Sequence, residues 1–245
     1  MHKGWKIVLA VLGLLVVIST GFVIWGYTPA RPMTEALTAL QSDSQVTVSI
    51  GEWLVFSPAA ARPSTGLIIY PGARIDVRAY VPAAYQIAAQ GYLVVIVQMP
   101  LNLAVLDAGA AGDVIAAHPD IQHWAVGGHS LGGAMAANFA YSHPGVVQGL
   151  VLWAAYPASS DDLSQSGLSV VSIYATLDGL TSGEDIRASR ALLPAVTKWV
   201  AIDGGNHAQF GWYGDQSGDN RAVISRQEQQ ELVVESTVAL LESIK

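Results

Sequence analysis

The sequence predicts an α/β domain in which helices cover a mostly parallel sheet. From residue 46 onward, short apolar runs alternate with helical patterns, an order typical of parallel strands joined by helices. The apolar runs lack a polar alternation, which indicates strands that are buried on both faces. A length of 245 residues, 51% of them apolar and 13% charged, suits one such domain with a large core.

The N-terminal segment, residues 7–27, predicts a membrane anchor. It contains no charged residue and is long enough to cross the hydrocarbon core, which takes about 20 helical residues. Trp5, Trp25 and Tyr27 lie near its ends, where aromatic rings prefer the membrane interface. The alternative is a cleaved secretory signal. We favour the anchor because the run exceeds the usual ~7–15 residues of a signal core and no convincing cleavage site follows it.

The charges on either side of this segment predict on which side of the membrane the following domain lies. Lys3, Lys6 and the terminal amine outweigh Arg31 on the far side. The positive-inside rule therefore places the domain outside the cytoplasm, and cleavage would make it secreted. We divide the chain into an anchor over residues 1–27, a linker over 28–45 and an α/β domain over 46–245.

The linker contains two prolines and a segment at 33–40 that fits either a brief helix or more linker. A hairpin formed by residues 46–50 and 52–56 around Gly51 is expected to lead into the sheet. The buried strands are expected at 67–70, 93–97, 124–127, 147–153, 170–175 and 199–202. The helices between them are expected at 81–89, 104–117, 131–142 and 186–192.

The C-terminal helix, residues 226–243, has the strongest signals. Ser225 and Glu228 form a capping box before it. Its apolar stripe consists of Leu232, Val233, Leu240, Leu241 and Ile244. Elsewhere, the connection between the strands at 147–153 and 170–175 is too short for a helical cap domain. We therefore predict an open or shallow pocket.

Composition excludes several classes of function. The formal net charge of −7, from 19 acidic and 12 basic residues, argues against nucleic acid as a partner. The absence of cysteine excludes disulfides, thiolate metal sites and cysteine nucleophiles. No pair of histidine and acidic residues has zinc-like spacing, so the sequence implies neither a metal nor another cofactor.

The segment Gly128-His129-Ser130-Leu131-Gly132 predicts a nucleophilic serine. It lies between a predicted strand and a predicted helix, where the pattern glycine-any-serine-any-glycine forms a tight, strained turn. A Cβ at Gly128 or Gly132 would clash in this turn. The Ser130 hydroxyl would then be exposed at a helix N-terminus, which favours developing negative charge.

A base and an orienting acid are predicted at the same edge of the sheet. Asp178 follows the strand at 170–175, and His207 follows the strand at 199–202. The carboxyl ends of parallel strands meet at one crevice, so Ser130, Asp178 and His207 are expected to converge there. Asp203 is the alternative acid. We expect His129 to pack beside the sheet. The other histidines expected to be structural or solvated are His118, His123 and His143.

Two backbone N–H groups are expected to stabilise an oxyanion. One belongs to Leu131, directly after the nucleophile. The other is expected from the loop after the strand at 67–70, with Ala73 preferred and Gly72 second. The alternative for this loop is an ordinary proline-glycine turn.

Five stretches of the chain carry a resemblance to a known group of enzymes. They are Tyr70–Arg74, Gly91–Asn102, Gly127–Gly133, Leu152–Pro157 and Gly204–Gly211. With them the chain resembles bacterial α/β-hydrolases of the fold-5, dienelactone-hydrolase-like type. The resemblance implies the α/β-hydrolase fold, the triad Ser130–Asp178–His207 and hydrolysis of carboxylic esters.

The chain departs from the group that it resembles in two places. Dienelactone hydrolases proper use a cysteine nucleophile, so their substrate does not transfer to this chain. Pro71 stands where many lipases and esterases have histidine, which affects the assignment of the oxyanion donor.

Residues expected at the pocket edge are Arg74, Met99, Leu101, Asn102, Tyr156, Phe210, Trp212 and Tyr213.

The predicted activity is hydrolysis of a small-molecule ester, of short to medium acyl chain, through an acyl-enzyme intermediate. An acyltransferase would share that intermediate, with an alcohol in place of water. A membrane-tethered binding protein of the same fold would lack turnover. A peptidase is disfavoured because no pocket for a side chain or a free terminus is evident.

Overall fold

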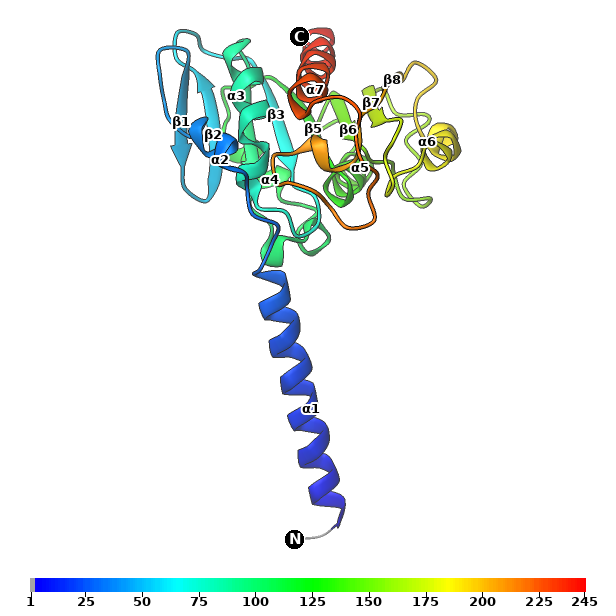
Figure 1. Ribbon diagram of the computed structural model, residues 1–245. Helices are drawn as coiled ribbons and strands as arrows, with labels where there is room; N and C mark the ends of the chain where they lie inside the picture. Colours follow the sequence, from blue (N-terminus) through cyan, green and yellow to red (C-terminus); the bar gives the residue numbers. More distant parts are fainter. Residues whose placement is uncertain (1–2) are drawn as a thin grey trace.

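An eight-stranded sheet forms the centre of the domain (Figure 1). The computed structural model describes residues 3–245. The strands are β1 (Val46–Ile50), β2 (Trp53–Pro58), β3 (Thr65–Tyr70), β4 (Leu93–Val97), β5 (His123–His129), β6 (Gly149–Trp153), β7 (Ser169–Ala175) and β8 (Lys198–Ile202). Their order across the sheet is β1-β2-β4-β3-β5-β6-β7-β8. The pairs β1–β2 and β2–β4 are antiparallel, and all the others are parallel, so the predicted hairpin and mostly parallel sheet are confirmed.

Helices cover both faces of the sheet. The α-helices of the domain are α2 (Thr34–Thr38), α3 (Val81–Ala89), α4 (Ala111–Ala117), α5 (Leu131–Ser142), α6 (Gly183–Ser189) and α7 (Arg226–Ser243). The 3₁₀ helices are η1 (Val77–Tyr80), η2 (Pro100–Asn102), η3 (Ala104–Leu106), η4 (Arg190–Leu192) and η5 (Ala208–Phe210). The core beneath α3 and α7 is separate from the core beneath α4 and α5.

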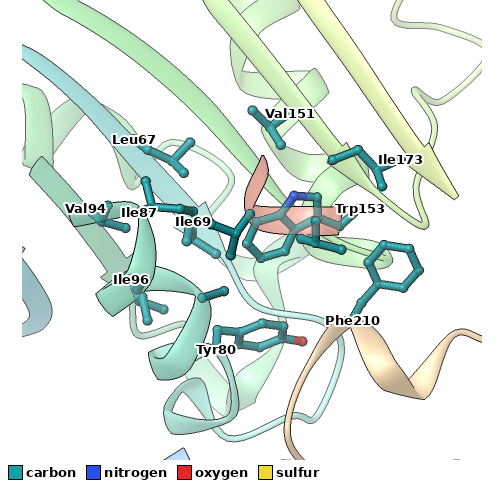
Figure 2. Packing of buried hydrophobic residues seen from close by; sticks show 14 of the residues in the cluster. Leu67, Ile69, Tyr80, Ile87, Val94, Ile96, Val151, Trp153, Ile173 and Phe210 are labelled. Atoms are coloured by element: carbon teal, nitrogen blue, oxygen red, sulfur yellow. The ribbon is translucent and has the colours of Figure 1, made fainter. Parts of the chain in front are cut away.

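Strand β3 shows why the buried runs lack polar alternation. Leu67 and Ile69 pack into the core under α3 and α7, whereas Ile68 and Tyr70 pack into the core under α4 and α5. Both faces are therefore apolar. Figure 2 shows the first of these cores, in which the aromatic side chains of Trp153, Tyr80 and Phe210 lie beside aliphatic residues of the sheet.

Several element boundaries differ from the sequence-based expectation, and for three of them the structure shows a local reason. The helix predicted at 104–117 is interrupted between η3 and α4, because the Tyr70 hydroxyl donates to the Ala108 carbonyl and accepts from the Ala111 N–H. The helix predicted at 186–192 begins earlier, because Ser182 and Asp185 form a capping box. The strand predicted from residue 147 begins at Gly149, because a turn bonds the Val146 N–H to the His143 carbonyl.

Helix α1 (Lys3–Gly26) extends away from the domain (Figure 1). Its segment Ile7–Gly26 is long and apolar enough to cross a membrane, and its residues up to Trp25 are exposed, whereas Gly26 is buried. The side chains of Lys3 and Lys6 and the amino terminus, on which the predicted orientation depends, lie outside the described part of the chain.

Candidate active site

Ser130 occupies the turn between β5 and α5. Its backbone has φ 54° and ψ −123°, a conformation that is strained for a residue with a Cβ. The Ser130 N–H donates to the Trp153 carbonyl at 2.9 Å, which fixes the turn against β6. A Cβ at Gly128 or Gly132 would overlap the carbonyl oxygen of Tyr70, so only glycine lets the turn lie against the end of β3. The serine itself is half-buried.

Asp178 and His207 form a buried pair beyond the ends of β7 and β8. His207 Nδ1 lies 2.8 Å from Asp178 Oδ2, and both side chains are excluded from solvent. The other carboxylate oxygen accepts from the N–H groups of Leu180 and Thr181, at 2.8 and 2.6 Å. Since an ionised carboxylate can only accept, Nδ1 carries the proton, and Nε2 of the neutral ring keeps the lone pair.

The alternative acid is engaged elsewhere. Asp203 Oδ1 accepts a hydrogen bond from the Thr176 hydroxyl at 3.1 Å. Asp178 is therefore the carboxylate that the fold brings to His207.

The base and the nucleophile come from neighbouring loops. The rings of His207 and His129, the residue before Ser130, have centroids 4.4 Å apart. His207 Nε2 is buried without a hydrogen-bond partner, and within residues 3–245 no hydrogen bond joins it to Ser130 Oγ. The Nε2 lone pair is thus free to accept a proton.

Asp219 holds the acid loop and the base loop together. Its Oδ1 accepts from the Gly179 N–H at 3.0 Å, and its Oδ2 accepts from the Ala208 N–H at 2.8 Å. Those two residues directly follow Asp178 and His207. One carboxylate therefore fixes the spacing of both loops.

Helix α7 holds the base loop from the other side. The Gln229 side chain accepts from the Asn206 N–H at 3.0 Å and donates to the Asn206 carbonyl at 2.8 Å. Sequence reasoning missed both Asp219 and Gln229. Only the pairing of their side chains with backbone groups of distant loops reveals their role, and no local pattern signals it.

His129 takes part in a different buried network. Its Nδ1 lies 2.9 Å from the Tyr80 hydroxyl, which accepts the Gly72 N–H at 2.9 Å. Burial lowers the pKa of His129 well below its usual value, and the nearby His207 lowers it further. Burial also raises the pKa of Tyr80. Both groups therefore stay neutral, with the tyrosine O–H donating to the histidine. Sequence reasoning expected the packing of His129 but missed Tyr80.

The two candidate donors in the loop after β3 differ in availability. The Gly72 N–H is engaged by Tyr80, whereas Ala73 is exposed and its N–H has no partner among the described residues. Leu131 is the first residue of α5, so its N–H has no acceptor within the helix. Ala73 and Leu131 are thus the N–H groups that remain available here.

Two residues expected at the pocket edge bind the end of α1 instead. The Arg74 guanidinium donates to the carbonyls of Trp25 and Thr28, at 3.0 and 2.7 Å. The Asn102 amide donates to the Gly26 carbonyl at 2.9 Å. Their polar groups therefore serve the junction with the N-terminal helix.

The other residues expected at the pocket edge differ in burial. Met99 and Phe210 are buried, and the Phe210 ring stacks on His129 with centroids 5.7 Å apart. Trp212 is half-buried, while Tyr156 is 38% exposed. A cavity of about 230 Å³ lies beside Ala73 and Tyr213. Residues 154–168, between β6 and β7, contain no helix, consistent with the absence of a large cap.

Among residues 3–245, no cluster of three histidine or acidic side chains is arranged to hold a metal ion. The buried acid–base pair, the strained serine and the available N–H groups are instead the components of nucleophilic acyl transfer.

Residues 66–231 match the sequence model of the alpha/beta hydrolase family. No curated protein matches the chain in sequence.

Solved structures share the fold at low identity. An esterase from Thermogutta terrifontis has a TM-score of 0.57 at 14% identity, over 80% of this chain and 92% of its own. The esterase domain of a Rhodothermus marinus protein has a TM-score of 0.59 at 15% identity, over 76% of this chain and 90% of its own. A predicted CIB-like hydrolase from Thermoplasma acidophilum has a TM-score of 0.56 at 12% identity, over 80% of this chain and 98% of its own.

Proposed function

We propose that this chain, which belongs to the alpha/beta hydrolase family, hydrolyses carboxylic esters with Ser130 as the nucleophile. The observation that carries the proposal is the buried Asp178–His207 pair, whose free Nε2 belongs to the loop packed beside the strained serine turn. The esterases of the same fold add support for an ester substrate.

In the proposed reaction, His207 Nε2 takes the proton of Ser130 Oγ as that oxygen attacks the ester carbonyl. The N–H groups of Leu131 and Ala73 stabilise the oxyanion. Asp178 holds the imidazole in the required tautomer and stabilises its charged form. His207 then protonates the leaving alcohol, and it later activates the water that releases the acid from the acyl-enzyme.

The proposed substrates carry short to medium acyl chains. No helical cap covers the site, since residues 154–168, which connect β6 to β7, contain no helix. A series of p-nitrophenyl esters from acetate to palmitate measures this preference. A preference for palmitate would contradict it.

Helix α1 is proposed as an uncleaved anchor that holds the domain outside the cytoplasm. Its apolar residues from Ile7 to Trp25 are exposed, and the predicted positive charge lies before them. Sequencing of the N-terminus of the mature, membrane-extracted protein tests the proposal, because a cleaved signal would leave a new terminus beyond α1.

The test of the nucleophile is labelling with a fluorophosphonate, which reacts with activated serines. The full-length protein in detergent is expected to be labelled at residue 130, and Ser130→Ala to lose both labelling and turnover. Ser142→Ala, at an exposed serine of α5, is the matched control and should keep both. Labelling that persists in Ser130→Ala would place the nucleophile elsewhere.

A competing alcohol distinguishes hydrolysis from acyl transfer. A hydrolase gives the free acid as its main product when the alcohol is added, whereas an acyltransferase gives mostly the new ester. We expect the acid.

A further inference from the structure

The end of α1 is bonded to loops that leave the sheet beside the candidate active site. Carbonyls of a helix's last turn have no partner within the helix, and the helix dipole places negative charge there. Arg74 and Asn102 donate to the carbonyls of Trp25 and Gly26 in this turn, and Arg74 also donates to the carbonyl of Thr28 just after the helix. The Arg74 guanidinium also lies 4.2 Å from the centre of the Trp25 ring.

The chain after α1 continues along the same loop. The Ala30 N–H donates to the Arg74 carbonyl at 2.7 Å, and the Asp76 N–H donates to the Ala30 carbonyl at 3.1 Å. The Arg74 N–H in turn donates to the Asn102 carbonyl at 2.8 Å. The junction is therefore a hydrogen-bonded unit of α1, the loop after β3 and the loop after β4.

This junction is directly continuous with the proposed oxyanion hole. Arg74 directly follows Ala73, the proposed oxyanion donor. Since two residues of chain span at most about 7 Å, the junction lies close to that donor. A Cβ at Gly72 would lie only 2.8 Å from His129 Nδ1, so the loop lies against the residue before the nucleophile. The carboxyl edge of the sheet thus lies at the end of α1, on the side of the domain from which the helix emerges (Figure 1).

Exposed apolar side chains surround the junction. Val105 and Leu106 of η3, just after Asn102, are 56% and 50% exposed. Trp25 and Tyr27, at the end of α1, are 43% and 68% exposed. We call these four residues the rim. Figure 1 shows the segment after β4 beside the end of α1. Water-exposed apolar and aromatic groups that adjoin a membrane helix suit the lipid interface.

We propose that the rim lies in the lipid interface, so that the active-site edge of the domain faces the bilayer and takes its ester from the membrane. The substrate class is then an amphiphilic ester whose acyl chain partitions into lipid and whose carbonyl lies near the headgroups. The proposal rests on the anchoring and the esterase activity proposed above.

The first test measures depth in the bilayer and needs no activity. Because the chain has no cysteine, a single cysteine can be placed and labelled with an environment-sensitive fluorophore. Val105→Cys reports the rim. Val196→Cys is the control, since Val196 is 84% exposed and precedes β8 at the opposite edge of the sheet.

Both full-length variants are reconstituted in phosphatidylcholine vesicles that contain lipids with a quencher near the headgroup. We expect the label at residue 105 to be quenched and blue-shifted, and the label at residue 196 to be neither. Equal, weak quenching at both positions would overturn the proposal.

The second test separates delivery of the substrate from catalysis. It compares p-nitrophenyl laurate dissolved in phosphatidylcholine vesicles with p-nitrophenyl acetate in water. Val105→Ser combined with Leu106→Ser is expected to lower hydrolysis of the laurate about tenfold, since two side chains lose favourable lipid contact, and to leave the acetate rate unchanged. Val196→Ser should change neither rate.

The outcomes of the two tests are distinguishable. An equal loss for both esters in the rim variant, or no loss for either, would contradict delivery from the membrane. A protein that hydrolyses neither ester, yet shows quenching at residue 105, would disprove the esterase activity while retaining the orientation.

Discussion

Two neighbouring histidines, His207 and His129, lie in the same buried region but have opposite chemical properties. Their ring centroids are 4.4 Å apart, and the Nε2 atoms of both are buried without a partner. Nδ1 of His207 faces the Asp178 carboxylate, whereas Nδ1 of His129 faces the Tyr80 hydroxyl. A carboxylate compensates an imidazolium charge and a phenol does not. The partner of a buried histidine therefore decides whether it can serve as a base.

Removal of His207 should have the largest effect. Without its imidazole nothing accepts the Ser130 proton, and His129 cannot replace it because burial keeps that ring neutral and its Nδ1 bonded to Tyr80. We expect His207→Ala to lower turnover on the order of 10⁶-fold, as in other serine triads. The measurement is p-nitrophenyl acetate hydrolysis by the full-length protein in detergent.

The matched control for this variant is His123→Ala. His123 begins β5, at the edge of the sheet opposite the candidate site, so His123→Ala should leave turnover unchanged. Near-normal turnover in His207→Ala would show that another group acts as the base.

Asp178→Asn should have the next largest effect. An amide that donates to Nδ1 would leave the proton on Nε2, so the ring would present the wrong tautomer to Ser130. The expected loss of turnover is about 10³–10⁴-fold, with folding preserved. Asp203→Asn is the control, since Asp203 bonds Thr176 and not His207. A larger loss in Asp203→Asn than in Asp178→Asn would reverse the assignment of the acid.

The strand ends explain why so much of the site could be predicted from sequence. Parallel strands place their carboxyl ends at one edge, so a residue that follows a buried apolar run can be assigned to that edge without coordinates. This reasoning applied to Ser130, Asp178 and His207, which all follow strands. It also predicted the fold, because runs buried on both faces differ in pattern from the helices between them.

The supporting residues could not be predicted in this way. Asp219, Gln229 and Tyr80 act on groups far from them in sequence, and nothing in their own neighbourhood indicates the partner. Arg74 and Asn102 were expected near the pocket because their loops end at the right edge. Their backbones have positive φ, at 54° for each, and a local pattern does not reveal where such a residue directs its side chain.

Tyr80→Phe separates the network of His129 from that of His207. The substitution keeps the ring but leaves the Gly72 N–H and His129 Nδ1 unpaired in the interior. We expect a loss of about 1–3 kcal/mol in unfolding free energy. Turnover should fall less than about tenfold, since Asp178 and His207 are untouched.

Thermal unfolding of the detergent-solubilised protein measures this effect, at roughly 2–4 °C per kcal/mol for a chain of this size. Tyr141→Phe, at a tyrosine that is 45% exposed, is the control and should leave the midpoint unchanged. A fall in turnover as large as that of Asp178→Asn would mean that Tyr80 belongs to the catalytic machinery.

The smallest expected effect is a pH dependence of stability that originates at His129. Burial lowers its pKa in the folded state, whereas in the unfolded chain the pKa is about 6.5. Below that pH the unfolded state binds a proton that the folded state rejects, so unfolding free energy falls as the pH falls, by up to about 1.4 kcal/mol per pH unit. His129→Gln removes the titrating group, and its unfolding free energy should fall less than that of the parent between pH 7.5 and 5.

The measurement is urea unfolding of both proteins over this pH range. The other five histidines are present in both proteins, so the difference between the two series isolates the His129 ring. Parallel series would show that His129 is protonated in the fold, and the phenol would then be as effective a partner as the carboxylate.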